Sequence, residues 1–355
     1  MSEIWLQEYI FLAFRLHKAA ETAYGSPFVE EYWGPPAWRE QVETEPEMVA
    51  DDLVRQVIAL ADVLPAQGFA PNRMAYLGKH LRAMETLARK LCGETFTLAE
   101  AAARCLDIHP IWTSEAQFEE AHALYESVLP GMGNLAERLQ AYKAGVACPP
   151  EQRNLIPAFV DLAFAEARKR TNRLAELPEG ETIDIEYLFE WEHEAAAYYR
   201  GHYLTHIVIN TAAAATSLSR LFDHKVCHEG YPGHHTEYVL KEQHLVRRGY
   251  TEQTLYLMLV PQCVISEGIA MVAHEMIFSE GEAEHWIAEQ MDRLLHREVD
   301  AQALLRLRQA SDLLEGVWAM QPCCWMRGIP RQRRRSTSSS ICCFQKSEPL
   351  PILLF

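Results

Sequence analysis

One stretch of this 355-residue chain bears on both its fold and its chemistry: His228-Glu229-Gly230-Tyr231-Pro232-Gly233-His234-His235. Imidazole nitrogens and carboxylate oxygens are the ligands that zinc sites use, and a carboxylate beside such a site can act as a general base. The most compact arrangement is H-E-x-x-H on one helix, where two histidines share a face and the glutamate follows the first. Position 232 is proline here, so the strict motif is absent.

The spacing raises the question of how a second histidine could meet His228. On an unbroken helix, position i+6 lies about 120° from position i, and i+7 lies about 20° away but about 10 Å along the axis. Pro232 and Gly233 disfavour a regular helix at this point. A local bulge, a feature that favours functional sites, would return a later histidine to the face of His228. We expect His234 as the second ligand, with His235 as the alternative.

A third ligand is expected on a nearby element, and the chain continues with Ser266-Glu267-Gly-Ile-Ala-Met-Val-Ala-His274-Glu275. Glu267 lies in the first turn of a helix predicted over 264–279, and we expect it to be this ligand. Glu275 or His274 is expected to contact a ligand histidine from its outer side, where zinc-bound histidines usually donate their other nitrogen to a carboxylate. His224 is an alternative ligand.

Polar and aromatic side chains also gather just before the histidine stretch. Within them, Tyr203 and His206 are candidates for stabilising the oxyanion of a tetrahedral intermediate. Residues 202–210 are rich in β-branched and aromatic side chains and partly alternate, which predicts a strand.

The rest of the chain is mainly helical in pattern, with apolar residues three and four apart and charged residues between them. This pattern predicts helices over 3–23, 48–65, 71–92, 115–129, 133–145, 151–176, 235–248, 252–260, 264–279 and 283–316. We therefore expect a mainly α fold with a small β element at about 202–210, beside the metal-binding helix. The expected regions are a helical N-terminal region, 1–180, and a metal-binding catalytic region, 181–318.

Charge and composition narrow the classes of partner. The net charge is −16, and residues 1–326 alone carry 27 basic and 48 acidic side chains, a net charge of −21. A body this acidic repels phosphate backbones, so nucleic-acid binding is not expected. The N-terminus lacks the basic segment of a signal peptide, and no stretch reaches the roughly 20 apolar residues that span a bilayer. With nine cysteines lacking paired spacing, this predicts a cytoplasmic location and no membrane association.

Residues 319–355 do not continue the pattern. They come after a strongly patterned helix, and their own sequence is basic and serine-rich with no helical period. Read one base earlier, the codons from Ala319 onward are compatible with Asn-Ala-Ala-Leu-Leu-Leu-Asp-Ala, which would extend that helix. We interpret 319–355 as an aberrant tail produced by a frameshift, which would remove C-terminal helices.

The stretch 228–235, followed by Ser266-Glu-Gly-Ile-Ala, resembles a bacterial family catalogued as domain of unknown function eight-eight-five. Its members look like zinc peptidases with an H-E-x-x-P-G-H-H signature and a later E-G helix. The resemblance covers roughly residues 180–318. It implies a multi-helical zinc-peptidase-like architecture and favours His234 over His235. It also makes 202–210 similar to the edge strand on which such enzymes lay an extended substrate.

These observations predict a Zn²⁺-dependent hydrolase acting on a peptide or small amide substrate. His228, His234 and Glu267 would hold the metal, and Glu229 would be the general base. One alternative is a catalytically inactive, truncated helical scaffold that binds zinc. Another is a helical interaction protein without a metal.

Overall fold

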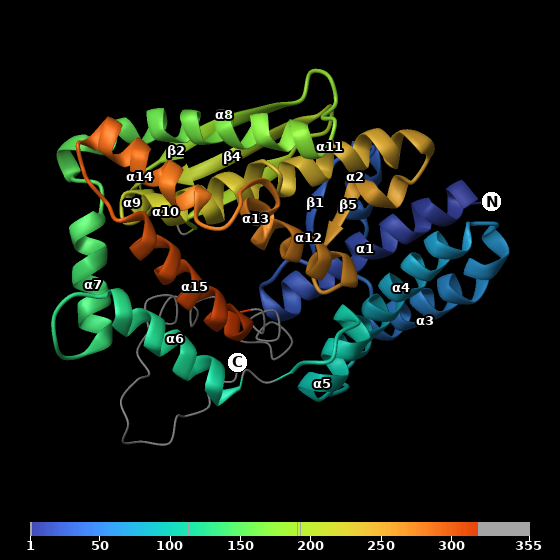
Figure 1. The fold of residues 1–355 in the computed structure, drawn as a ribbon. Helices are drawn as coiled ribbons and strands as arrows, with labels where there is room; N and C mark the ends of the chain where they lie inside the picture. Colours follow the sequence, from blue (N-terminus) through green and yellow to red (C-terminus); the bar gives the residue numbers. More distant parts are fainter. Residues whose placement is uncertain (1, 112–113, 190, 192, 319–355) are drawn as a thin grey trace. The chain divides into compact units, whose positions relative to one another are not determined.

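The computed structural model describes residues 2–111, 114–189, 191 and 193–318 (Figure 1). Most of these residues are helical, and the strands form two small sheets. This confirms the mainly helical fold. The chain divides into two compact units that alternate along the sequence: 1–112 with 244–265, and 113–243 with 266–318. The boundary drawn at residue 180 from the sequence falls inside the second unit.

The first unit is built around its N-terminal helix. Its elements are α1 (Ser2–Tyr24), β1 (Val29–Tyr32), α2 (Pro36–Thr44), α3 (Ala50–Val63), η1 (Leu64–Gln67), α4 (Pro71–Leu91), α5 (Leu98–Ala101), η2 (Ala102–Leu106), η5 (Val246–Arg248), η6 (Thr251–Thr254) and β5 (Leu255–Leu257). Side chains on most sides of α1 are buried, including Tyr9, Ile10 and Leu16. A helix buried this fully is the core of its unit rather than a surface cover.

The prediction of a helix over 252–260 is wrong. The chain there forms a short 3-10 turn and then β5, which pairs antiparallel with β1, with Val29 opposite Leu257. All three residues of β5 are buried. A short run of consecutive apolar residues has no period that separates a buried strand from a helix, so sequence patterning could not decide here.

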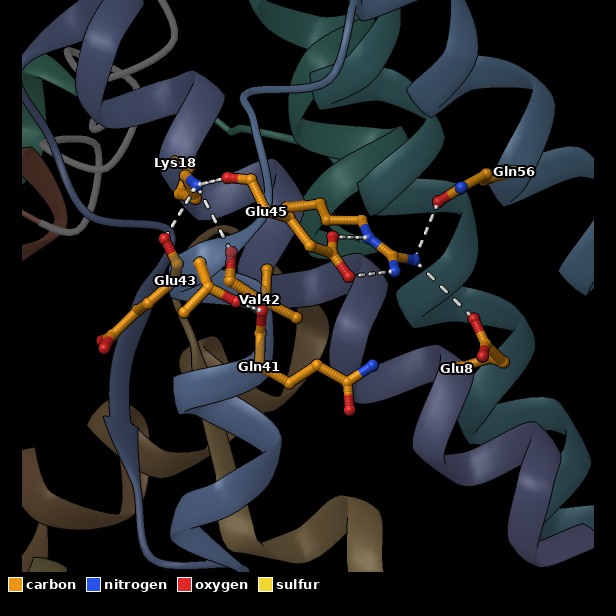
Figure 2. Close-up of polar contacts among 9 residues, drawn as sticks. Glu8, Lys18, Gln41, Val42, Glu43, Glu45 and Gln56 are labelled. Carbon is orange, nitrogen blue, oxygen red and sulfur yellow. Dashed lines mark hydrogen bonds and ion pairs between the residues drawn. The ribbon is translucent and has the colours of Figure 1, made fainter.

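Polar side chains of α1 hold the end of α2 (Figure 2). Lys18 Nζ donates to the carbonyl oxygens of Val42, Glu43 and Glu45, at the C-terminal end of α2. The last carbonyl groups of a helix commonly need such donors from outside the helix. Arg15 binds the Glu45 carboxylate with two hydrogen bonds, of 2.7 and 2.8 Å. The arrangement fixes where α2 ends against α1.

The second unit combines helices with a three-stranded sheet. Its elements are α6 (Glu115–Val128), α7 (Leu135–Val146), η3 (Pro150–Leu155), α8 (Ile156–Leu174), β2 (Thr182–Leu188), β3 (Ala195–Tyr199), β4 (Leu204–Asn210), α9 (Thr211–Ala214), α10 (Leu218–Leu221), η4 (Phe222–Gly230), α11 (His234–His244), α13 (Ala273–Ile277), α14 (Glu282–Leu295) and α15 (Ala301–Trp318). Helix α12 (Pro261–Met271) contributes its residues from Ser266 onward. Figure 1 shows α8 along the sheet and α15 beside α6.

The sheet has the strand order β2-β4-β3, with β4 parallel to β2 and antiparallel to β3. The predicted strand 202–210 is therefore present as β4, but it is the central strand and not an edge strand. Side chains alternate between the two faces of a sheet. Ile207 and Ile209 face the core with α8 and η4. His206 faces the opposite side together with Asp184 and Glu186.

Two predicted helices are interrupted. The helix 264–279 is split at Val272 into α12 and α13. The helix 283–316 ends at His296, whose φ of 51° is left-handed, and the chain becomes helical again at Ala301. Such a residue closes a helix by satisfying its last carbonyl groups, although glycine or asparagine is the usual choice. The proposed frameshifted tail, 319–355, lies outside the described residues.

None of the described helices combines the length and the apolar composition needed to cross a membrane.

Candidate metal centre

The segment between His228 and His234 folds back on itself. The π-helix η4 ends at Gly230, a cis Tyr231–Pro232 peptide follows, and α11 begins at His234. The Gly233 amide donates to the carbonyl oxygen of Cys227 at 3.0 Å. A Cβ atom at Gly233 would lie 1.9 Å from the His228 carbonyl oxygen, so only glycine permits this approach. This turn accommodates the two residues by which the stretch is longer than H-E-x-x-H.

This path brings His228, His234 and Glu267 together. The two imidazole rings are perpendicular, with centroids 4.8 Å apart. His228 Nε2 lies 3.6 Å from Glu267 Oε2, and His234 Nε2 lies 3.5 Å from Glu267 Oε1. One ligand atom from each of the three residues lies within 4.8 Å of the others. The three residues expected to be metal ligands are therefore neighbours.

The spacing of these atoms suits a metal ion. Four tetrahedral ligands at about 2.0–2.2 Å from zinc lie about 3.3–3.6 Å from one another. Both nitrogen-to-oxygen distances fall within this range. They are at or beyond the limit of an effective hydrogen bond. Two imidazoles and one carboxylate, with Glu267 about half exposed, form a donor set that fits zinc with a position left open.

The outer nitrogen of His234 faces Glu237 and Ser266. His234 Nδ1 lies 3.8 Å from Glu237 Oε2 and 3.4 Å from Ser266 Oγ. Ser266 Oγ and Lys241 Nζ both donate to the Glu237 carboxylate. Metal-binding histidines are commonly oriented by a carboxylate in this way. The expectation of His274 or Glu275 in this role is wrong for His234.

Electrostatics around His234 favour positive charge. Burial alone lowers the pKa of His234, but the carboxylates of Glu237, Glu267 and Glu229 outweigh burial and raise this pKa to about 9. Glu229 is itself buried, with 7% of its surface exposed. A site with this surplus of carboxylate attracts a cation, whether a proton or a metal ion.

His235 is engaged elsewhere, although it follows His234 directly. Its Nε2 donates to Glu181 Oε2 at 2.7 Å, and its Nδ1 lies 2.7 Å from Thr205 Oγ1. The side chain is fully buried. Both ring nitrogens therefore have protein partners. Of the two histidines left open by the sequence, the structure places His234 with His228 and His235 in a separate network.

Two other candidates from the sequence, His206 and His224, are not among the three grouped residues. His206 binds Asp184 at 2.9 Å and Glu186 at 3.2 Å, on the sheet face opposite Thr205. His224, the alternative ligand, is not one of the three grouped residues. Burial, followed by neighbouring cations, lowers the pKa of His224 to about 3, so it stays neutral.

Tyr203 lies in the turn between β3 and β4. Its backbone is left-handed, with φ of 63°, and its amide donates to the hydroxyl of Tyr199 at 3.1 Å. Tyr199 in turn donates to Glu242, two helical turns beyond His234 on α11. These contacts tie the turn to α11, and Tyr199 also stacks on Tyr238, whose ring stacks on that of His234.

Sequence reasoning missed Glu237 and Glu181. Glu237 follows His234 by three positions and precedes Lys241 by four, a spacing at which helical side chains meet. That signal was available. Glu181 is 54 positions before His235, and no local pattern links them.

Comparison with family models, curated proteins and solved structures gave no match. The resemblance drawn from residues 228–235 and 266–270 therefore stays a prediction, and function is argued from geometry.

Proposed function

We propose that this protein is a zinc-dependent hydrolase that cleaves a peptide or related amide bond. The observation that carries the proposal is the grouping of His228, His234 and Glu267 beside a buried Glu229. The three grouped residues would hold the zinc ion. When bound, zinc polarises a carbonyl group and lowers the pKa of a water molecule.

Glu229 is the residue suited to move the proton. It follows His228 directly, and its charge contributes to the raised pKa of His234, so its carboxylate lies in the field of the cluster. Its carboxylate oxygen would accept a proton from the attacking water and pass it to the nitrogen of the leaving amine. A buried position keeps bulk water from competing for that proton.

The sheet supports an extended peptide as the substrate class. Among the described strands, β3 pairs only with β4, so it is an edge strand, and it packs beside η4, which carries His228 and Glu229. In antiparallel pairing the backbone groups of alternate residues point away from the partner. The amide of Asn210 donates to the Glu194 carbonyl group, which puts Ala195 and Ala197 in the outward set. An extended backbone can pair with such an edge.

Glu229→Gln separates a hydrolase from an inactive zinc-binding scaffold. The zinc-loaded protein should cleave members of a peptide library, and the variant should lose about 10²–10⁴-fold in rate while keeping its zinc. Glu186→Gln, on the outer sheet face, is the matched control and should keep its activity. Zinc-loaded wild type that cleaves nothing would favour the scaffold. A variant as active as wild type would remove Glu229 from the mechanism.

A further inference from the structure

Glu181, just before β2, carries a buried carboxylate that accepts three hydrogen bonds. Its side chain is fully inaccessible to solvent. Oε1 accepts from Arg168 Nε at 2.6 Å, and Oε2 accepts from His235 Nε2 at 2.7 Å and from the hydroxyl of Tyr231. Arg168 supplies the compensating charge, without which a buried carboxylate is costly.

Two of these donors flank the second histidine of the candidate centre. Tyr231 lies midway between His228 and His234, and His235 follows His234 directly. The rings of Tyr231 and His235 are 4.9 Å apart, and Thr205 fixes the other ring nitrogen of His235. One carboxylate therefore holds the chain on both sides of His234.

The remaining residues of this loop are confined by shape. A Cβ atom at Gly230 would lie 2.4 Å from Cε1 of Phe164, on α8. At Gly233 it would meet the carbonyl oxygen of His228. The loop from Gly230 to Gly233 is therefore tightly packed on both sides. The hydrogen bonds to Glu181 fix its position within that space.

We propose that Glu181 is a positioning residue for the metal centre, setting the separation of His228 and His234 by holding Tyr231 and His235. This rests on the proposed function, because it needs a metal at the cluster. The hydrogen-bond donors to Glu181 are Arg168, Tyr231 and His235, and none of them is a proposed ligand. Its effect reaches the metal only through the loop and the first turn of α11.

The test uses Co²⁺ as a spectroscopic substitute and Zn²⁺ for affinity, on the full chain. Glu181→Gln keeps the shape of the side chain but removes the charge and one acceptor. Outer partners of metal ligands typically contribute about 10–100-fold to affinity. We expect this variant to lose zinc affinity within that range and to change the visible absorption bands of bound Co²⁺. Tyr231→Phe removes only the hydroxyl that donates to Glu181 and keeps the Glu181 charge, so it should shift both readouts in the same direction by less.

Glu186→Gln is the control, because Glu186 lies on the outer face of β2. It should leave affinity and spectrum unchanged. Circular dichroism establishes that each variant is folded, and Tyr231→Phe carries the test if Glu181→Gln does not fold. Folded variants with wild-type affinity and an unchanged Co²⁺ spectrum would overturn the positioning role alone. Wild-type protein that binds neither metal would overturn the proposed function, and this inference with it.

Discussion

His234 and His235 are adjacent, yet they belong to two different kinds of polar site. The network around His235 is closed: both ring nitrogens and the Glu181 carboxylate have hydrogen-bond partners at 2.6–2.7 Å. The cluster around His234 is open: Nε2 faces Glu267 at 3.5 Å, and Glu267 is about half exposed. A structural network typically has all of its buried donors and acceptors hydrogen-bonded. Loosely spaced donors of metal-ligand type are typical of a binding site.

The largest expected effect is the contrast between two neighbouring substitutions. His234→Ala removes a proposed ligand. Zinc affinity should therefore fall by more than about 100-fold, which is the most that losing a residue behind a ligand typically costs. His235→Ala leaves all three proposed ligands in place but removes one of the two contacts by which Glu181 holds the loop, so zinc affinity should fall by no more than about 100-fold. It also takes one hydrogen bond from a buried carboxylate, which should cost about 2 kcal/mol or more of stability. Zinc titration and chemical denaturation of both variants measure the two effects. Equal zinc loss in both, with equal stability, would erase the distinction.

The pH dependence of stability should report the closed network. Burial raises the pKa of Glu181, but hydrogen bonds from His235, Tyr231 and Arg168 prevail and lower it to about 2. A lowered carboxyl pKa stabilises the fold above the unfolded value of about 4.5, and this contribution is lost as pH falls towards 2. Glu181→Gln should therefore be less stable than wild type by about 3 kcal/mol at pH 7, with the gap shrinking below about pH 4.5. A gap that is constant from pH 7 to pH 3 would contradict this assignment.

Glu237 should contribute to the open cluster by orienting His234. Glu237→Gln replaces the carboxylate that faces His234 Nδ1 by a neutral amide, so zinc affinity should fall by about 10–100-fold. Asp184→Asn, on the outer sheet face, is the control. Competition with a chelator of known affinity gives the comparison. An unchanged affinity in the folded variant would mean that Ser266 alone orients the ring.

The smallest effect is expected far from both histidines, in the first unit. Arg15, with 13% of its side chain exposed, binds Glu45 with two hydrogen bonds, whereas Arg39 and Glu43 form an exposed pair. Arg15→Ala should lower the free energy of unfolding by about 1–2 kcal/mol and Arg39→Ala by less than about 0.5 kcal/mol. Denaturant titrations measure both values, and zinc content should not change in either. Equal losses would show that burial does not set the strength of these pairs.

The sequence predicted the helical class and the closing of the histidine stretch because both depend on local rules. Apolar spacing marks the helices, and Pro232 with Gly233 marks the interruption that returns His234 to His228. Glu267 could be placed because it lies in the next helical pattern after the stretch, although α12 begins at Pro261, so that Glu267 lies inside the helix and not in its first turn as expected.

Features that depend on distant contacts escaped prediction. The strand over 182–188 was not predicted, although Ile183 and Ile185 alternate with Asp184 and Glu186 as they do in a strand. The strand order, with β4 in the centre, depends on pairing between separate segments. Glu181 and Thr205 meet His235 only after the chain has folded. Without these contacts His235 could not be distinguished from His234 on geometry.

The central claim, a zinc site made by His228, His234 and Glu267, is tested most directly by metal content. Mass spectrometry on the purified, folded protein, beside His234→Ala and Glu267→Ala, gives the number of zinc ions per chain. We predict about one zinc per chain in wild type, lost in both variants. Folded wild-type protein that neither carries zinc nor takes it up on addition would contradict the claim and leave a helical protein without a metal.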